Sequence, residues 1–211
     1  LWPALCGQWR GLRLTIASHA PRALLQEVFD GDWKLAHLEK DSGMIMTSAF
    51  DVQRTASAKT YRELHANWRQ AVQHTAQGLR ALKPDLLLAN VPYLPLAAAH
   101  AGMPAVAMSS RNWAEMYQHF CGDQPVASAI HAQILAAYNS AACFLRLEPG
   151  MPMSTLTRMQ SIGPVARIGR ERRDEIRQRL RLHRHERLVL VSLGGIATHI
   201  DMQHWPGLCD V

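Results

Sequence analysis

The chain has 211 residues, 48% of them hydrophobic and 19% charged, a balance that is typical of globular proteins and excludes an intrinsically disordered chain. This length accommodates one complete domain and part of another. The formal net charge of +6 is concentrated in residues 167–187, where nine arginines and four acidic residues leave +5, so a nucleic-acid-binding surface over the whole protein is not expected.

The first part of the chain predicts two short strands with a helix between them. Residues 1–9 read as the end of a helix, and residues 12–17 alternate in polarity like a strand. Pro21 suits the start of a helix over residues 22–29. A second strand is expected over residues 33–38, followed by a loop over residues 39–55 that shows no clear period.

The clearest helix in the sequence covers residues 56–82, where apolar positions recur at steps of three and four and predict one buried stripe. Pro84 is expected to stop this helix, because the residue before a proline is disfavoured in helical conformation. Residues 85–89 form a short, continuous apolar run, which is typical of a strand with helices on both faces of its sheet.

The next segment repeats the order of strand, helix and strand. Residues 96–101 predict a helix that ends at Gly102, and residues 104–108 predict an apolar strand. This order indicates a βαβ unit and therefore a parallel sheet. Two helices and a strand that closes the domain are then expected over residues 113–120, 126–142 and 142–147.

The last part of the chain predicts the beginning of a second domain. Residues 148–168 are rich in proline and glycine, as linkers are, and residues 170–182 predict a charged helix with an ion pair between Glu175 and Arg179. A buried strand over residues 188–192 would open a second Rossmann-like domain. We therefore divide the chain into residues 1–163, a Rossmann-like domain that lacks its first strand, and residues 164–211, a linker and the beginning of a second Rossmann-like domain.

Cysteine use and the chain ends bear on location. Four cysteines without a C-x-x-C pair fit free thiols in a reducing cytoplasm, and neither a signal peptide nor an apolar run of membrane-spanning length is found. We therefore expect a cytoplasmic protein. The chain begins with Leu1 within a predicted helix and ends shortly after a turn signal, so we also expect that it is truncated at both ends.

Two predicted strand ends carry polar and aromatic residues suited to a ligand. Ligands of open α/β sheets bind outside the carboxyl ends of the strands. Asn90 and Tyr93 follow one strand, and Asn112 and Trp113 follow the next, and such side chains can hydrogen-bond and stack on a sugar. Turn and capping chemistry explains the same residues equally well.

A second candidate site lies at the turn after the strand over residues 188–192. Gly194 and Gly195 would expose backbone N–H groups that can hold a diphosphate, with His199 close behind, although a tight turn without a ligand is an equally simple explanation. His19 follows the first strand and is a candidate general base. No metal site is expected, because no ligand spacing of a known metal motif occurs.

The arginine-rich helix is interpreted first as a solvated helix. The alternative is contact with an anionic membrane surface, which makes this helix a candidate for peripheral membrane contact.

Several stretches together resemble GT-B glycosyltransferases of the type that includes the lipid-linked peptidoglycan N-acetylglucosaminyltransferase, and also the GT-B-like N-terminal domains of some sugar kinases. The resemblance lies in the order and spacing of residues 83–88, 97–106, 112–113, 163–165, 179–180 and 188–195. It departs from the family after Gly195, where Ile196-Ala197-Thr198 stands in place of a further serine or threonine and a later glycine.

The resemblance implies two Rossmann-like domains with the active site between them. It implies that residues 1–163 are the acceptor side and residues 164–211 the beginning of the donor side, and that a sugar is transferred from a nucleotide-sugar donor to an acceptor with no cofactor besides the donor. The charge distribution had already given no reason to expect a nucleic acid as partner. Gly194 and Gly195 would match the turn near the donor diphosphate, and Asn112 a residue on the acceptor side. The alternative is a catalytically inactive GT-B-like binding or regulatory domain, associated with a sugar kinase.

Overall fold

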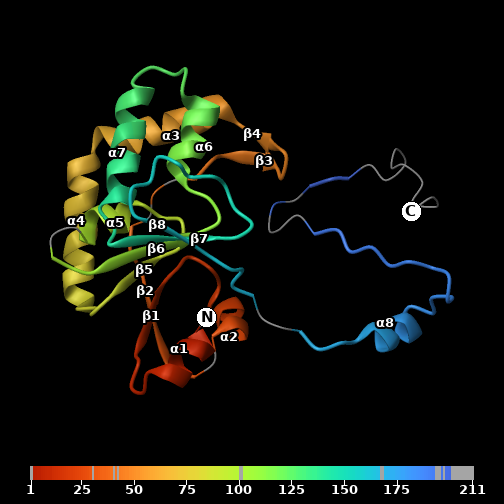
Figure 1. The fold of residues 1–211 in the computed structure, drawn as a ribbon. Coiled ribbons are helices and arrows are strands. Elements are labelled where there is room, and N and C mark those ends of the chain that lie inside the picture. The colour runs from red at the N-terminus through yellow and green to blue at the C-terminus, as the bar shows by residue number, and fades with distance from the viewer. Residues whose placement is uncertain are drawn as a thin grey trace.

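The computed structural model describes residues 2–29, 31–39, 41, 43–99, 102–166, 169–192, 196 and 198–200. The protein is an α/β protein in which a four-stranded parallel sheet alternates with helices in a Rossmann-like arrangement (Figure 1). Two smaller two-stranded sheets accompany it.

The N-terminal elements follow the sequence prediction. Helix α1 (Trp2–Gln8) precedes strand β1 (Leu14–Ala17), helix α2 (Arg22–Val28) and strand β2 (Trp33–Ala36). Strands β1 and β2 pair in parallel. They form a sheet of their own, with no hydrogen-bonded ladder to the four-stranded sheet in the part of the chain that the structure describes.

The loop expected over residues 39–55 contains a small antiparallel hairpin, so that prediction was wrong in part. Strand β3 (Met46–Ser48) pairs with β4 (Asp51–Val52). The Asp51 carboxylate accepts hydrogen bonds from the Thr47 hydroxyl and, at 2.9 Å, from the Gln53 side-chain amide. Strands of three and two residues are too short to show a period-two pattern.

The long predicted helix is two helices, α3 (Arg54–Ala66) and α4 (Trp68–Leu82), with a break at Asn67. The backbone of Asn67 leaves helical geometry, with φ −110° and ψ 23°. The predicted stripe is confirmed for most of its length, because Tyr61, Ala71, Thr75 and Leu79 are all buried, but its last member, Leu82, is 40% exposed. Helix α4 ends at Leu82, and Lys83 caps it in the left-handed conformation before Pro84.

The main sheet has the strand order β5-β6-β7-β8, and all its pairings are parallel. Helices α3 to α7 gather on one side of it (Figure 1). Its strands are β5 (Leu87–Ala89), β6 (Ala105–Ser109), β7 (Cys143–Leu147) and β8 (Met159–Ile162). The helices between them are α5 (Leu94–Ala99), α6 (Trp113–Cys121) and α7 (Ala127–Asn139).

Two expectations about this sheet were wrong. The closing strand is β8, which lies within the predicted linker, and β7 is an inner strand. Only Met159 and Ile162, the two ends of β8, are apolar, so the sequence carries no strand signal there. Strand β5 is at the edge of its sheet, so Leu88 is 41% exposed and is not covered as a central strand would be.

Four tyrosines form the centre of the core. Tyr61, Tyr93, Tyr117 and Tyr138 are almost completely buried, and they pack with apolar residues of the helices and of β7. Burial raises the pKa of all four phenol groups, because the phenolate form would lose its hydration. The hydroxyl groups of Tyr93 and Tyr138 have hydrogen-bond partners, whereas those of Tyr61 and Tyr117 have none among the described residues.

The C-terminal segment differs most from expectation. Helix α8 (Arg173–Arg179) is shorter than predicted, and Glu175 pairs with Arg172 instead of Arg179. Residues 188–192 are not a strand, and Leu190 is 89% exposed. A strand needs a neighbouring strand to pair its backbone groups, and no described strand pairs with residues 188–192.

His65 connects α3 to the tyrosine core. Its Nδ1 lies 2.7 Å from Gln133 Oε1, and its Nε2 lies 3.0 Å from the Tyr93 hydroxyl. Because an amide oxygen only accepts, Nδ1 carries the proton and Nε2 accepts from Tyr93. Burial lowers the pKa of His65, against a smaller opposing effect of Gln133.

This lowered pKa predicts acid sensitivity. The folded protein takes up the His65 proton less readily than the unfolded chain, so the free energy of unfolding falls as pH drops below the unfolded value of about 6.5. We expect His65→Gln to cost about 1 kcal/mol near neutral pH and to reduce the loss of stability on acidification. Urea unfolding of both proteins at about pH 8 and about pH 5.5 measures this, and equal losses in both would contradict it.

Candidate functional site

The β5–α5 and β6–α6 loops and the loop after β7 lie at the carboxyl edge of the four-stranded sheet. The segment after β2, a strand of the separate two-stranded sheet, contacts the first two of these loops. Ligands of α/β proteins bind at this edge, because loops from several strands converge there and helices begin there. The contacts among these segments define the candidate site.

The hydroxyl group of Tyr138, on α7, joins two of the loops. It donates a hydrogen bond to the Val91 carbonyl in the β5–α5 loop. The same oxygen accepts from the Trp113 backbone N–H, at 3.1 Å, at the start of α6. Val91 has a φ of +73°, which a β-branched residue rarely adopts, so the loop holds local strain at this point. Tyr138 thus fixes the relative position of the two loops that carry the predicted ligand contacts.

The segment after β2 is attached to the same place through Asp41 and Gly43. The buried Asp41 carboxylate accepts hydrogen bonds from the backbone N–H groups of Tyr93 and, at 3.0 Å, Leu94. Gly43 lies against the Trp113 ring so closely that a Cβ atom there would be 2.9 Å from Cζ2. The sequence analysis found neither residue, because a single aspartate and a single glycine in an irregular segment carry no pattern.

The loop after β7 completes the edge. The Met151 N–H donates to the Ser110 carbonyl at 2.8 Å. The Arg146 side chain, at the end of β7, pairs with Glu148 and also donates to the Pro152 carbonyl at 3.1 Å. These bonds engage the Arg146 guanidinium within the loop, so its role at this edge is to hold the loop in place.

The four predicted acceptor-binding residues have different environments. Asn90 is exposed and Trp113 is half-buried, so both can meet a ligand. Asn112 is completely buried, and its side-chain oxygen caps α6 by accepting from the Glu115 N–H at 2.8 Å. Its Nδ2 has no hydrogen-bond partner among the described residues. Tyr93 is buried with its hydroxyl bonded to His65, which is a structural position.

Arg111 belongs to the same predicted strand-end segment as Asn112 and Trp113. Its guanidinium lies 5.5 Å from the centre of the Trp113 ring, in cation–π geometry, and the residue is exposed. Together, Asn90, Arg111 and Trp113 present a carboxamide, a cation and an indole on two adjoining loops. Such a set can hydrogen-bond hydroxyl groups, attract an anionic group and stack on an apolar ring face.

The other predicted site residues lie elsewhere. His19 follows β1 and is exposed, and His199 is exposed in the C-terminal segment. The Ala49 N–H donates to Thr198 Oγ1 at 2.8 Å, which places that segment beside the β3–β4 turn. No hydrogen bond or ring contact between described residues joins either histidine to Asn90 or Trp113. Gly194 and Gly195 lie outside the described residues.

No group of three or more potential metal ligands comes together among the described residues. Cys6, Cys121 and Cys143 are free thiols. None of the helices in the described ranges combines the length and apolar character that crossing a bilayer requires.

Comparison with known proteins gives no family, since no family model, no curated protein and no solved structure matches the chain.

The Tyr138 hydroxyl can be tested against a matched tyrosine. Tyr138→Phe leaves the Val91 carbonyl and the Trp113 N–H without their partner and is expected to lower the free energy of unfolding by about 1–3 kcal/mol. Tyr117→Phe is the control, because the Tyr117 hydroxyl is equally buried but has no partner among the described residues. Chemical denaturation measures both, and equal losses would contradict the role assigned to Tyr138.

The contact between Gly43 and Trp113 gives a second test. Gly43→Ala introduces a Cβ that the indole must avoid, and we expect a loss of about 1–3 kcal/mol and a changed near-UV circular dichroism spectrum. Gly7→Ala is the control, since a Cβ at this helical position meets nothing within 4 Å and is expected to be neutral or to stabilise by about 0.5–1 kcal/mol. Unchanged stability and spectrum in Gly43→Ala would show that the contact is not formed.

Proposed function

We propose that the protein is the acceptor-side part of a GT-B-type glycosyltransferase, which transfers a sugar from a nucleotide-sugar donor to an acceptor. The observation that supports this proposal best is the arrangement at the carboxyl ends of β5 and β6. There Asn90, Arg111 and Trp113 lie on two loops that the Tyr138 hydroxyl holds together.

The chemistry of a sugar fits these three side chains. A pyranose ring has an apolar face, which an indole can cover, and a rim of hydroxyl groups, which a carboxamide can bind as both donor and acceptor. The exposed Arg111 guanidinium would bind an anionic group on the acceptor or on the donor. The fixed loops favour binding, because little conformational freedom remains to be lost.

The donor side of the proposal concerns residues 164–211. The backbone N–H groups of Gly194 and Gly195, which lie outside the described residues, and the side chain of His199 are proposed to bind the diphosphate of the donor and to stabilise it as it leaves. An acceptor hydroxyl would be deprotonated by a general base, for which His19 is the candidate in this chain. No metal ion is needed for these roles.

A transfer assay with a matched pair of tryptophan variants tests the proposal. We expect release of UDP or GDP from one member of a panel of nucleotide sugars when an acceptor is present. Trp113→Ala should lower kcat/KM for the acceptor about tenfold, which corresponds to about 1.4 kcal/mol. Trp9→Ala should leave it unchanged, because Trp9 is 55% exposed and is not part of the site.

The two hypotheses differ in the outcome of this assay. Absence of both nucleotide binding and turnover would count against the transferase. If saccharides still bound in ligand-observed NMR, and Trp113→Ala abolished that binding, the inactive GT-B-like binding domain would be the better description.

A further inference from the structure

Two buried polar atoms at the start of α6 have no hydrogen-bond partner among the described residues. One is Nδ2 of Asn112, a residue that is completely buried, and the other is Oε1 of Glu115. Buried polar groups in folded proteins are nearly always paired, because an unpaired group loses its hydration without compensation. Two unpaired atoms within one helical turn therefore point to a group that binds there.

The capping bond of α6 fixes the orientation of the Asn112 carboxamide. Asn112 Oδ1 accepts from the Glu115 N–H at 2.8 Å, so the remaining atom of the amide is the donor, Nδ2. Asn112 holds the N-cap position and Glu115 the third position of the helix, and side chains at these positions lie close enough to bond reciprocally in other helices. The first turn thus presents an unpartnered donor beside an unpartnered acceptor.

These atoms belong to the edge at which the acceptor is proposed to bind. Helix α6 begins after the carboxyl end of β6, and Trp113 stands between the two residues in the chain. Both Trp113 and Glu115 are half-buried, so each side chain reaches the surface. Rotation of either side chain would let a ligand group reach the two atoms, and such rotations are common when proteins bind their partners.

A hydroxyl group fits this pair of atoms better than a charged group does. One hydroxyl oxygen can accept from Nδ2 while its proton is donated to Oε1. An ammonium group would leave Nδ2 without an acceptor. A phosphate or carboxylate group would leave Oε1 without a donor and would be repelled by the Glu115 carboxylate.

We propose that Asn112 and Glu115 select one hydroxyl group of a pyranoside whose ring lies against Trp113. Asn112 Nδ2 donates to the hydroxyl oxygen, and the hydroxyl donates to Glu115 Oε1. A pyranoside that lacks this hydroxyl leaves both atoms unpaired, so the pair decides which sugars bind. The inference rests on the acceptor site of the proposed function and does not depend on the nucleotide sugar.

Binding of methyl glycosides to the 211-residue chain, followed by ligand-observed NMR titration, tests the pair. The probes are methyl β-glucopyranoside, methyl β-galactopyranoside and methyl α-mannopyranoside, together with the monodeoxy analogues of the one that binds most tightly. We expect one deoxy analogue to bind about tenfold more weakly than its parent glycoside, and the other analogues to stay within about threefold of it.

The variants Glu115→Ala and Asn112→Ser should remove this preference. Serine caps a helix about as well as asparagine does, so Asn112→Ser deletes Nδ2 and keeps the cap. In each variant the parent glycoside should bind about tenfold more weakly, and the selected deoxy analogue should bind about as well as its parent. A purely structural effect would weaken all the glycosides together and leave their ratio unchanged.

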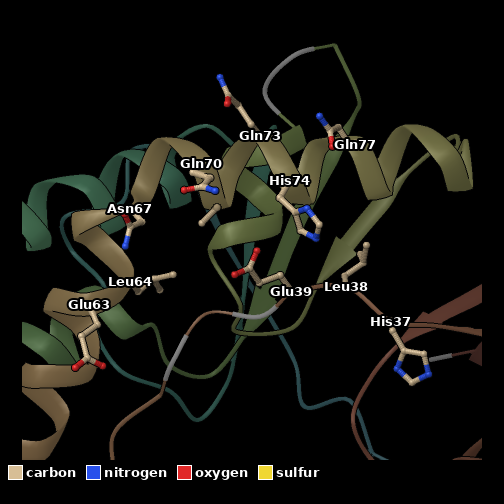
Figure 2. A pocket seen from close by; sticks show the side chains of 11 residues that line it. His37, Leu38, Glu39, Glu63, Leu64, Asn67, Gln70, Gln73, His74 and Gln77 are labelled. Atoms are coloured by element: carbon tan, nitrogen blue, oxygen red, sulfur yellow. The ribbon is translucent and has the colours of Figure 1, made fainter.

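Matched controls are Glu63→Ala and Asn67→Ser. Figure 2 shows both side chains at the open hollow beside α3 and α4. Glu63 is an exposed helical carboxylate, and Asn67 holds the N-cap position of α4 without a side-chain capping bond. Both controls should keep the affinity for the parent glycoside and the tenfold preference.

Three results would overturn the proposal. They are no binding of any of the three glycosides, equal tolerance of the loss of every hydroxyl group, and a preference that persists in Glu115→Ala and Asn112→Ser. With either of the last two, binding that Trp113→Ala abolishes would leave the proposed acceptor site in place. Loss of the preference in both variants would support the pair even without turnover of any nucleotide sugar.

Discussion

The hydroxyl group of Tyr138 is the interaction on which the candidate site depends. One buried oxygen donates to the Val91 carbonyl and accepts from the Trp113 N–H, and so it joins the loops after two neighbouring strands. Without it, both backbone groups would lose their partner in a partly buried region, which lowers the free energy of unfolding. The strained conformation of Val91 can persist because the surrounding bonds determine it.

Other buried polar groups extend this constraint. Asp41 attaches the segment after β2 to the first residues of α5, and His65 fixes the Tyr93 ring from the side of α3. Each group is satisfied by a partner from a different part of the chain. Buried networks of this kind specify one arrangement, because an alternative packing would leave several of their members unpaired. The same network keeps Tyr93 inside the core and leaves Asn90 and Trp113 available at the edge.

The segment after β2 serves two surfaces. Through Asp41 and Gly43 it contacts the β5–α5 loop and Trp113, and residues 37–39 line an open hollow beside α3 and α4. The two surfaces have different charge, with an arginine at the carboxyl edge and glutamates in the hollow.

The sequence by itself determined the elements whose signal is local. The stripe of α4, the apolar strands β5 and β6 and the helix between them were predictable, because burial imposes a period that survives in the order of residues. The tertiary structure decided what depends on distant partners. It divided the long helix at Asn67 and made Met159–Ile162 an edge strand. It left residues 188–192 outside any sheet, because pairing requires a neighbour that a local pattern does not reveal. Asn90 and Trp113 could be selected as strand-end residues, but Asp41, Gly43 and Tyr138 could not, because each acquires its role from a contact with a residue far away in the chain.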